Sequence, residues 1–115
     1  MSDRPTSDPN RNAVVSVQDA AGADVSIPVV VGSGEGEVRG VKALQIRDWT
    51  EASKAFAEVV AKDPKNYNAA FGLAVSLEAM GKFEEAAGQY KAANYIESKQ
   101  ANLDGIKRCE AKAGQ

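Results

Sequence analysis

Two stretches of this chain share one pattern: residues 48–64 read DWTEASKAFAEVVAKDP, and residues 82–98, 34 positions later, read KFEEAAGQYKAANYIES. Small and aromatic residues return at the same places in both copies, with Phe56, for example, recurring as Tyr90. A helical unit of this kind cannot bury its apolar face alone and has to stack on a neighbour, and the stack leaves a groove. The repeat therefore predicts a helical stack with a binding or scaffolding role.

Helix start and stop signals surround both copies. Asp48 is followed three residues later by Glu51, which is a capping pattern, and Asn66 stands in a capping position before the next apolar stretch. Pro64 ends one helix, and Gly81 suits the left-handed position that follows another. The helical periodicity between these signals predicts five helices, over about residues 37–46, 49–62, 67–80, 83–96 and 99–112.

Before the helices, the apolar residues recur with a period of two. Valine and isoleucine alternate with other residues over 15–17 and 25–31, and the turn-rich segment between them contains Gly22, so the pattern predicts a β-hairpin. Pro28 cannot donate a ladder hydrogen bond, and its strand should therefore be an edge at that point. We expect a disordered tail over residues 1–12, the hairpin and a glycine-rich linker over 13–36, and a helical domain over 37–115.

The composition argues against several classes of partner. The chain is 43% hydrophobic and 26% charged with a net charge of −2, and it has no basic stripe, so we expect neither nucleic acid nor an anionic membrane as a partner. No apolar run approaches the roughly 20 residues that span a bilayer. The N-terminus lacks the charged and then apolar segments of a secretory signal. We therefore expect a cytoplasmic protein, although a trimmed exported protein would show the same start.

We do not expect this chain to be an enzyme. It has no histidine, which removes the usual general base and the usual transition-metal ligand. Cys109 is the only cysteine, so the chain has no intrachain disulfide and no thiolate cluster for a metal. Its acidic residues fall mostly on predicted solvent faces. The sequence thus predicts no catalytic residue, no metal and no cofactor.

From about residue 38 to 98, the chain resembles the tetratricopeptide repeat, a helix-turn-helix unit of 34 residues. The second helix of that unit has a small residue, a large aromatic residue four positions later, and then a proline. The first copy supplies all three, and the second copy has serine in place of the proline: Ala52, Phe56 and Pro64, then Ala86, Tyr90 and Ser98. The resemblance implies a mainly α fold, namely a tetratricopeptide-like α-α superhelix of about five helices, preceded here by a short N-terminal β-hairpin. It comprises about two repeats and a C-terminal capping helix.

The resemblance also implies where a partner would bind, because the first helices of successive repeats line the concave face in this family. The partner-binding positions that it implies are Val41, Leu44, Gln45, Asn68, Phe71, Val75 and Glu78. Phe71 lies on a helical stripe between Tyr67 and Val75, and such a stripe is more often formed by side chains that pack in the core. The sequence leaves both interpretations open.

Two functions follow from these patterns. The first is a small adaptor or scaffold that binds an apolar segment of a protein partner of unknown identity in its concave groove. The second is a structural subunit that joins copies of itself through the hairpin or the end helices. A two-stranded hairpin is marginal alone, so it should pack on the helices, pair with another copy, or join a partner's sheet. The sequence does not choose among these placements.

Overall fold

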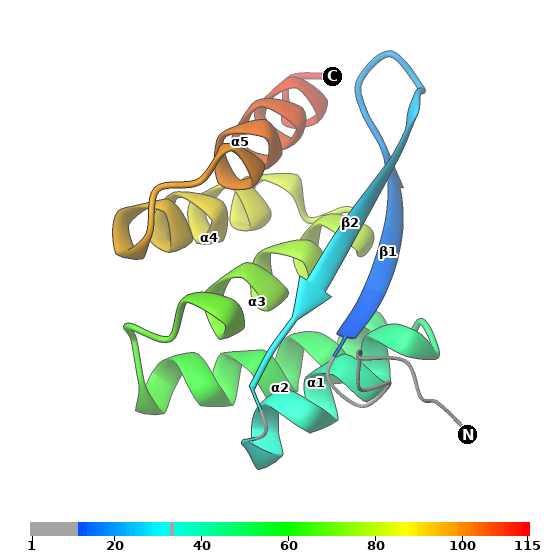
Figure 1. The fold of residues 1–115 in the computed structure, drawn as a ribbon. Helices are drawn as coiled ribbons and strands as arrows, with labels where there is room; N and C mark the ends of the chain where they lie inside the picture. Colours follow the sequence, from blue (N-terminus) through cyan, green and yellow to red (C-terminus); the bar gives the residue numbers. More distant parts are fainter. Residues whose placement is uncertain (1–11, 33) are drawn as a thin grey trace, which may run out of the picture.

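The computed structural model describes residues 12–32 and 34–115 and shows a two-stranded antiparallel hairpin followed by five helices (Figure 1). This arrangement confirms the predicted fold, which is mainly α and resembles a tetratricopeptide stack. The elements are β1 (Asn12–Gln18), β2 (Asp24–Val30), α1 (Glu35–Gln45), α2 (Trp49–Lys62), α3 (Tyr67–Ala79), α4 (Phe83–Ile96) and α5 (Gln100–Ala113).

The helix boundaries follow the local signals. The α2 and α4 helices cover the predicted residues, and the Asp48 and Asn66 carboxylate and amide oxygens accept the backbone N–H groups of Glu51 and Ala69 at 3.1 and 3.0 Å. The α1 helix begins two residues earlier than predicted, because Glu35 favours the first turn, where a negative charge meets the helix dipole. The predicted tail, residues 1–12, lies outside the described residues except for Asn12, which is the first residue of β1.

The turns that end α1 and α3 share one backbone geometry. Gly81, with φ of 82°, follows α3, and the Lys82 N–H donates to the Leu77 carbonyl at 2.9 Å. After α1, the corresponding position is Arg47, with φ of 63°, and the next N–H again donates five residues back. A left-handed residue in this position closes a helix, and glycine adopts it without the strain that a side chain adds.

Replacing Arg47 by glycine should therefore raise the free energy of unfolding by about 1 kcal/mol, since the strain at a positive φ is relieved. The midpoint of urea unfolding measures this change. The reciprocal variant Gly81→Ala should be less stable by a similar amount. If Arg47→Gly lowers the midpoint, the arginine side chain contributes more to stability than its backbone conformation costs.

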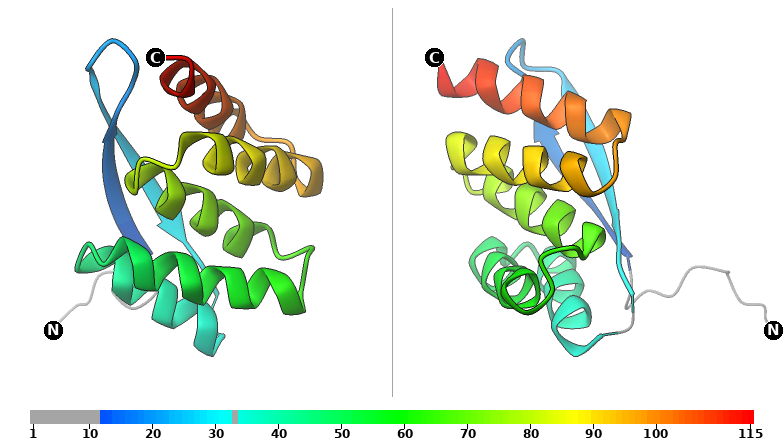
Figure 2. Two further views of the ribbon diagram at one scale, coloured as in Figure 1. Left: turned by 180° about the vertical axis from the view of Figure 1, so that it is seen from behind. Right: turned by 90° about the vertical axis from the view of Figure 1, so that its left-hand side faces the viewer.

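The helices pack on one another in sequence order, so that α3 lies in the middle of the stack (Figures 1 and 2). The aromatic residue of each copy fills the place where neighbouring helices come closest. A Cβ atom added at Gly40 of α1 or at Gly72 of α3 would lie 2.5–2.9 Å from the Phe56 ring, and one at Gly105 would lie 2.6–2.7 Å from the Tyr90 ring. The absence of a side chain at these glycines lets the helix backbones approach the rings.

The hairpin packs on α1 and α3, on one side of the helical stack (Figure 2). Its strands pair from Asn12 opposite Val30 to Gln18 opposite Asp24. Alternate residues face the helices and are buried in the same hydrophobic cluster as the helix residues: Ala13, Val15, Ile27 and Val29, followed by Val31. The hairpin is thus part of the main core rather than an appended arm.

Polar contacts hold β1 at both ends. The Gln45 amide donates to the carbonyl of Asn12 at 2.6 Å, and the Lys112 ammonium group donates to the carbonyl of Gln18. Beyond β1, the Gln115 amide donates to the carbonyl of Ala20 in the hairpin loop at 3.3 Å. The first strand is therefore connected to α1 and to the C-terminal end of the chain.

Candidate functional site

The predicted groove residues on α1 and in the centre of α3 lie within the core. Val41 and Val75 are fully buried and Leu44 is 2% exposed. These residues belong to the cluster that includes Val15 and Val29 of the hairpin, and the hairpin packs on both of their helices. The structure brings the three side chains together, but on a helix face that the chain's own hairpin covers.

Glu78, another predicted binding position, makes a buried ion pair. Its side chain is 0% exposed, and its carboxylate accepts from Arg108 Nε and Nη2 at 2.8 and 2.9 Å. The Tyr90 hydroxyl donates to the same carboxylate at 2.7 Å. Burial and then the Glu78 charge raise the pKa of Tyr90, and the hydrogen bonds that Arg108 donates to Glu78 raise the pKa of Arg108. The cluster joins α3, α4 and α5, and sequence spacing gave no signal for a pair 30 residues apart.

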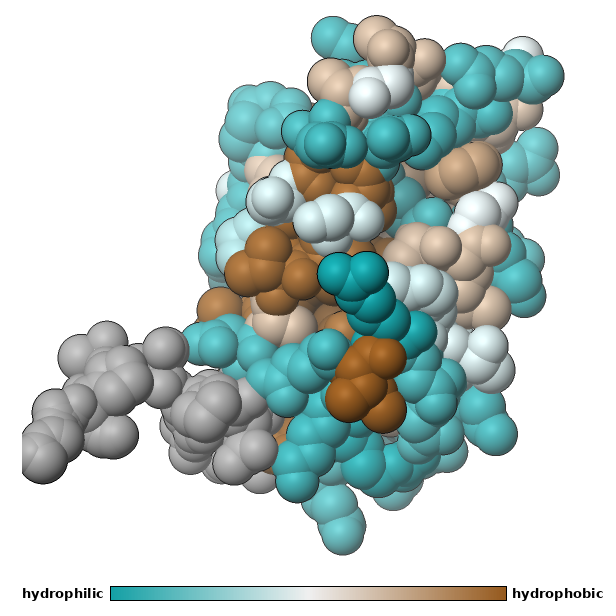
Figure 3. All heavy atoms as spheres, turned by 90° about the vertical axis from the view of Figure 1, so that its right-hand side faces the viewer, coloured by the Kyte–Doolittle hydropathy of each residue, from teal (hydrophilic) through white to brown (hydrophobic). Residues whose placement is uncertain are grey.

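The outer face of the hairpin is partly apolar. Val14 and Val30 are 67% and 55% exposed, and Ile46, just after α1, is 76% exposed. Figure 3 views the molecule from the hairpin side and shows apolar side chains gathered near the middle of this face, with polar side chains around them. Exposed apolar groups of this kind, when they are contiguous, mark interaction surfaces.

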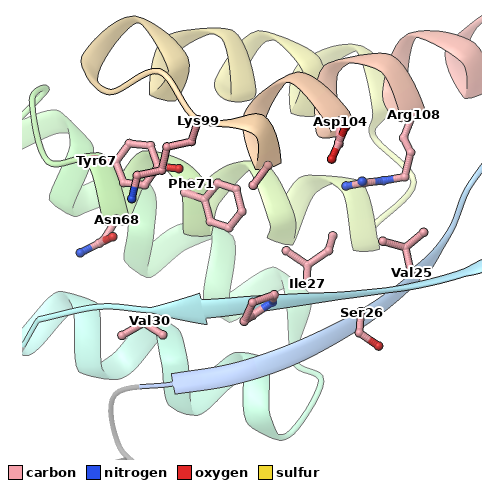
Figure 4. A pocket seen from close by; sticks show the side chains of 12 residues that line it. Val25, Ser26, Ile27, Val30, Tyr67, Asn68, Phe71, Lys99, Asp104 and Arg108 are labelled. Atoms are coloured by element: carbon pink, nitrogen blue, oxygen red, sulfur yellow. The ribbon is translucent and has the colours of Figure 1, made fainter.

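A cavity of about 310 Å³ opens between β2, α3 and α5 (Figure 4). We call it the β2–α5 groove. It is lined by Val25, Ser26, Ile27, Pro28 and Val30 of β2, by Tyr67, Asn68 and Phe71 of α3, and by Lys99, Ala101, Asp104 and Arg108 at α5. A second cavity of about 430 Å³ shares Val25, Asp104 and Arg108 and continues towards the hairpin loop. Two of the predicted binding residues, Asn68 and Phe71, therefore line an accessible groove.

Phe71 packs in the core and lines the groove. Its ring stacks on that of Tyr67 with 5.9 Å between the ring centroids, and meets the Tyr90 ring edge-on at 5.7 Å. The side chain is only 7% exposed. The Tyr67 hydroxyl donates to the buried amide oxygen of Asn102 at 3.2 Å, and burial raises the pKa of Tyr67. The aromatic wall of the groove is thus fixed before any partner arrives.

Charged groups lie on the α5 side of the groove. The Lys99 ammonium group lies 4.7 Å from the centre of the Tyr67 ring and 2.7 Å from a carboxylate oxygen of Glu97. Asp104 and Arg108 lie at the other end, near Val25 (Figure 4). The sequence pattern does not single out these groups, because the family resemblance makes the last helix a terminal cap with no part in binding. Only the fold brings them next to β2.

The Cys109 thiol should make stability depend on alkaline pH. Burial, and then the charge of Glu78, raise the pKa of this thiol to about 12 from its usual 9.0. The unfolded chain loses the proton first, so the contribution is complete below pH 9 and decreases as the pH rises from 9 towards 12. We expect urea midpoints to fall above pH 9 and to fall less steeply in Cys109→Ala. An equal slope in both proteins would assign the pH dependence to the tyrosines.

Two other features are absent from the described part of the chain. Within residues 12–32 and 34–115, no group of three or more histidine, cysteine, aspartate or glutamate residues could hold a metal ion. No helix in the same part of the chain is long and apolar enough to cross a membrane.

Comparison with known proteins identifies the helical stack. The family model described as tetratricopeptide repeat matches residues 38–100, which is more than half of the chain and extends from α1 to the first residue of α5. No curated protein and no solved structure matches the chain. The hairpin lies outside the matched residues. Repeats of this kind are generally protein–protein interaction modules, and the chain belongs to the tetratricopeptide repeat family.

Proposed function

We propose that this protein is an adaptor or scaffold that binds a segment of another protein in the β2–α5 groove and does not catalyse a reaction on it. The observation that carries this proposal is the groove itself, which is preformed and lined by Tyr67, Phe71 and Ala101 on one side and by a strand edge on the other. Preformed clefts with apolar walls and a few polar groups are the usual form of a binding site.

The predicted binding residues have different roles in this proposal. Asn68 and Phe71 contact the partner segment directly, since both line the groove. Val41, Leu44 and Val75 support the hairpin from beneath, because they share its hydrophobic cluster. The other two predicted positions fix the surrounding elements, since Gln45 binds the start of β1 and Glu78 binds α5 through Arg108.

A variant that fills the groove tests this proposal. Ala101 is exposed and lines the groove, so Ala101→Trp should block it without disturbing the core. Ala92 is exposed on α4 and lines none of the cavities described here, so Ala92→Trp is a matched control. Short random peptides displayed on phage are selected on the full chain, and their affinities are then measured by calorimetry. Selected peptides should bind the control as they bind the original protein, and at least tenfold more weakly to Ala101→Trp.

The proposal fails if the selected peptides bind all three proteins equally, because their site would then lie elsewhere. It also fails if no peptide is enriched. Circular dichroism and urea unfolding of both tryptophan variants establish that any loss of binding comes from the blocked groove and not from unfolding.

The exposed outer face of the hairpin favours a second function, self-assembly. Val14 and Val30 point away from the core, so Val14→Lys combined with Val30→Lys should leave the fold intact. If copies join through this face, light scattering should give a mass well above 12.1 kDa for the original chain and a monomer for the double variant. A monomeric original chain would exclude this function. Removing the whole hairpin is not a suitable test, because its residues belong to the core.

A further inference from the structure

We propose that the partner segment binds as a third β-strand on the open edge of β2, with an acidic side chain beside Lys99. This inference rests on the proposed function and specifies its mode of binding. The occupant is an extended stretch of a foreign protein whose side chains alternate between the groove and solvent. Strand addition of this kind takes its affinity from backbone hydrogen bonds and its specificity from alternate side chains.

The register of the hairpin shows which backbone groups of β2 face outward. In an antiparallel pair, every second residue directs its N–H and C=O groups away from the neighbouring strand. The carbonyls of Asn12 and Gln18 accept from side chains outside the sheet, which places these residues in the outward set of β1. Their cross-strand partners are Val30 and Asp24, so the outward set of β2 also contains Ser26 and Pro28.

The two edges of the hairpin differ in their availability. The Gln45 amide and the Lys112 ammonium group occupy the outward carbonyls at the two ends of β1. Among the described residues, none makes a hydrogen bond to the outward backbone groups of Ser26, Pro28 or Val30. These groups border the β2–α5 groove. An open strand edge beside a groove is a template for an extended chain.

The packing of the hairpin leaves room for one more strand. The hairpin packs on α1 and α3, whereas the main packing partner of α5 is α4. A strand added to β2 would lie about 4.8 Å further along the sheet, over the N-terminal part of α3 and over α5. Its inward side chains would meet Phe71, Tyr67 and Ala101, which form the groove wall there (Figure 4).

Charge favours an acidic residue at the Val30 end of the strand. In Figure 4, Lys99 lies at that end, beside Tyr67 and Asn68, whereas Asp104 and Arg108 lie at the Val25 end. Arg108 is already neutralised by Glu78, and Asp104 repels a second carboxylate. Lys99 pairs with Glu97, but both side chains are half exposed, so a carboxylate of the partner can replace that of Glu97. Charge complementarity thus places the acidic side chain next to Lys99.

Pro28 favours a foreign strand over a second copy of this chain. Its missing N–H lies on the open edge, since Pro28 belongs to the outward set. If two copies paired through β2, each would bring a proline to the shared edge, and the ladder would lose a donor on both sides. A foreign segment meets only one proline. Natural proteins place proline on exposed edges for this reason.

Defined peptides test the mode of binding. The probes are short, acetylated and amidated peptides of alternating valine and threonine, flanked by glutamate in one version and by lysine in the other. Two further versions of the glutamate peptide carry N-methyl groups on alternate nitrogens, in one register or the other. Only one edge of an added strand faces β2, so one N-methylated isomer should lose binding at least tenfold and the other should keep it. The lysine peptide should bind at least tenfold more weakly than the glutamate peptide.

Matched proline variants provide the second arm. Ser26 and Ser16 lie opposite each other and both belong to the outward sets, so Ser26→Pro removes an outward donor from β2 and Ser16→Pro removes one from β1 at comparable local strain. Ser26→Pro should weaken binding of the glutamate peptide at least tenfold, whereas Ser16→Pro should not. Lys99→Glu should reverse the preference between the glutamate and lysine peptides. Unfolding curves show whether each variant is folded. If Ser26→Pro is unfolded, the N-methylated peptides alone decide whether the peptide binds as a strand on β2.

The outcomes separate this inference from the proposed function. Equal binding of both N-methylated isomers, or equal binding of the glutamate and lysine peptides, overturns strand addition beside Lys99. If the defined peptides fail to bind while phage-selected peptides bind and are blocked by Ala101→Trp, strand addition is wrong and the adaptor function stands. If no peptide is blocked by Ala101→Trp, the proposed function itself is wrong.

Discussion

Replacing Glu78 by alanine should lower the free energy of unfolding by about 3–5 kcal/mol, because it leaves a buried positive charge without a partner. The Glu78 side chain is 0% exposed and that of Arg108 is 11% exposed. The Tyr90 hydroxyl would lose its acceptor as well. Small domains have total free energies of unfolding of roughly 5–15 kcal/mol, so this change removes a large part of the protein's stability. Urea unfolding followed by circular dichroism measures it.

An exposed ion pair provides the control for Glu78. Arg39 pairs with Glu58 at 3.2 Å across the surface, where both side chains are about half exposed. Glu58→Ala should change the free energy of unfolding by less than about 1 kcal/mol, since water screens such pairs. A comparable loss in both variants would mean that the cluster of Glu78, Tyr90 and Arg108 is open to solvent and does not join the helices in the way described.

Adding a single methyl group at Gly40 should destabilise the protein by about 2–3 kcal/mol. The new Cβ atom would lie 2.5 Å from the Phe56 ring, and the ring has little room to move, because Gly72 is close to the same ring. Overpacking of a filled core typically costs roughly 1–3 kcal/mol. The same change at Gly88 of α4, where nothing lies within 4 Å, should instead stabilise the helix by about 0.5–1 kcal/mol.

A smaller side chain in place of the Phe56 ring tests whether contact with the ring causes this loss. In the double variant Gly40→Ala with Phe56→Leu, the new methyl group has space, so the loss should be smaller than the sum of the two single losses. Urea midpoints of the two single variants, the double variant and Gly88→Ala measure the coupling. Additive losses would show that Gly40 acts through the backbone and not through contact with the ring.

Local signals predicted the helices well, and long-range contacts explain what they missed. The caps at Asp48 and Asn66 and the turn at Gly81 act within a few residues, so the starts of α2 and α3 and the end of α3 could be derived from sequence to within one residue. The period of two along the hairpin showed which of its residues are buried, but such a pattern does not show which surface these residues pack against. Whether the hairpin would pack on the helices therefore remained open until the fold was known.

The candidate site could be predicted only in part for the same reason. Resemblance to the family points to Asn68 and Phe71 on α3, and both line the groove. It could not show that a hairpin outside the repeats covers Val41 and Val75, because a repeat pattern describes only the contacts between repeats. In the same way, it could not show that Glu78 pairs with Arg108, because Arg108 lies beyond the two recognised copies.

The contact between the hairpin and the end of α5 has a consequence for how the chain folds. In an ordinary repeat stack each unit touches only its neighbours, and folding can begin anywhere and spread. Here Lys112 meets Gln18, 94 residues earlier in the chain. Contacts of such separation slow folding and make it cooperative. During synthesis the strands leave the ribosome before the helices, yet their contacts with α5 form only after α5 has emerged. We therefore expect one concerted transition rather than a stepwise assembly of repeats.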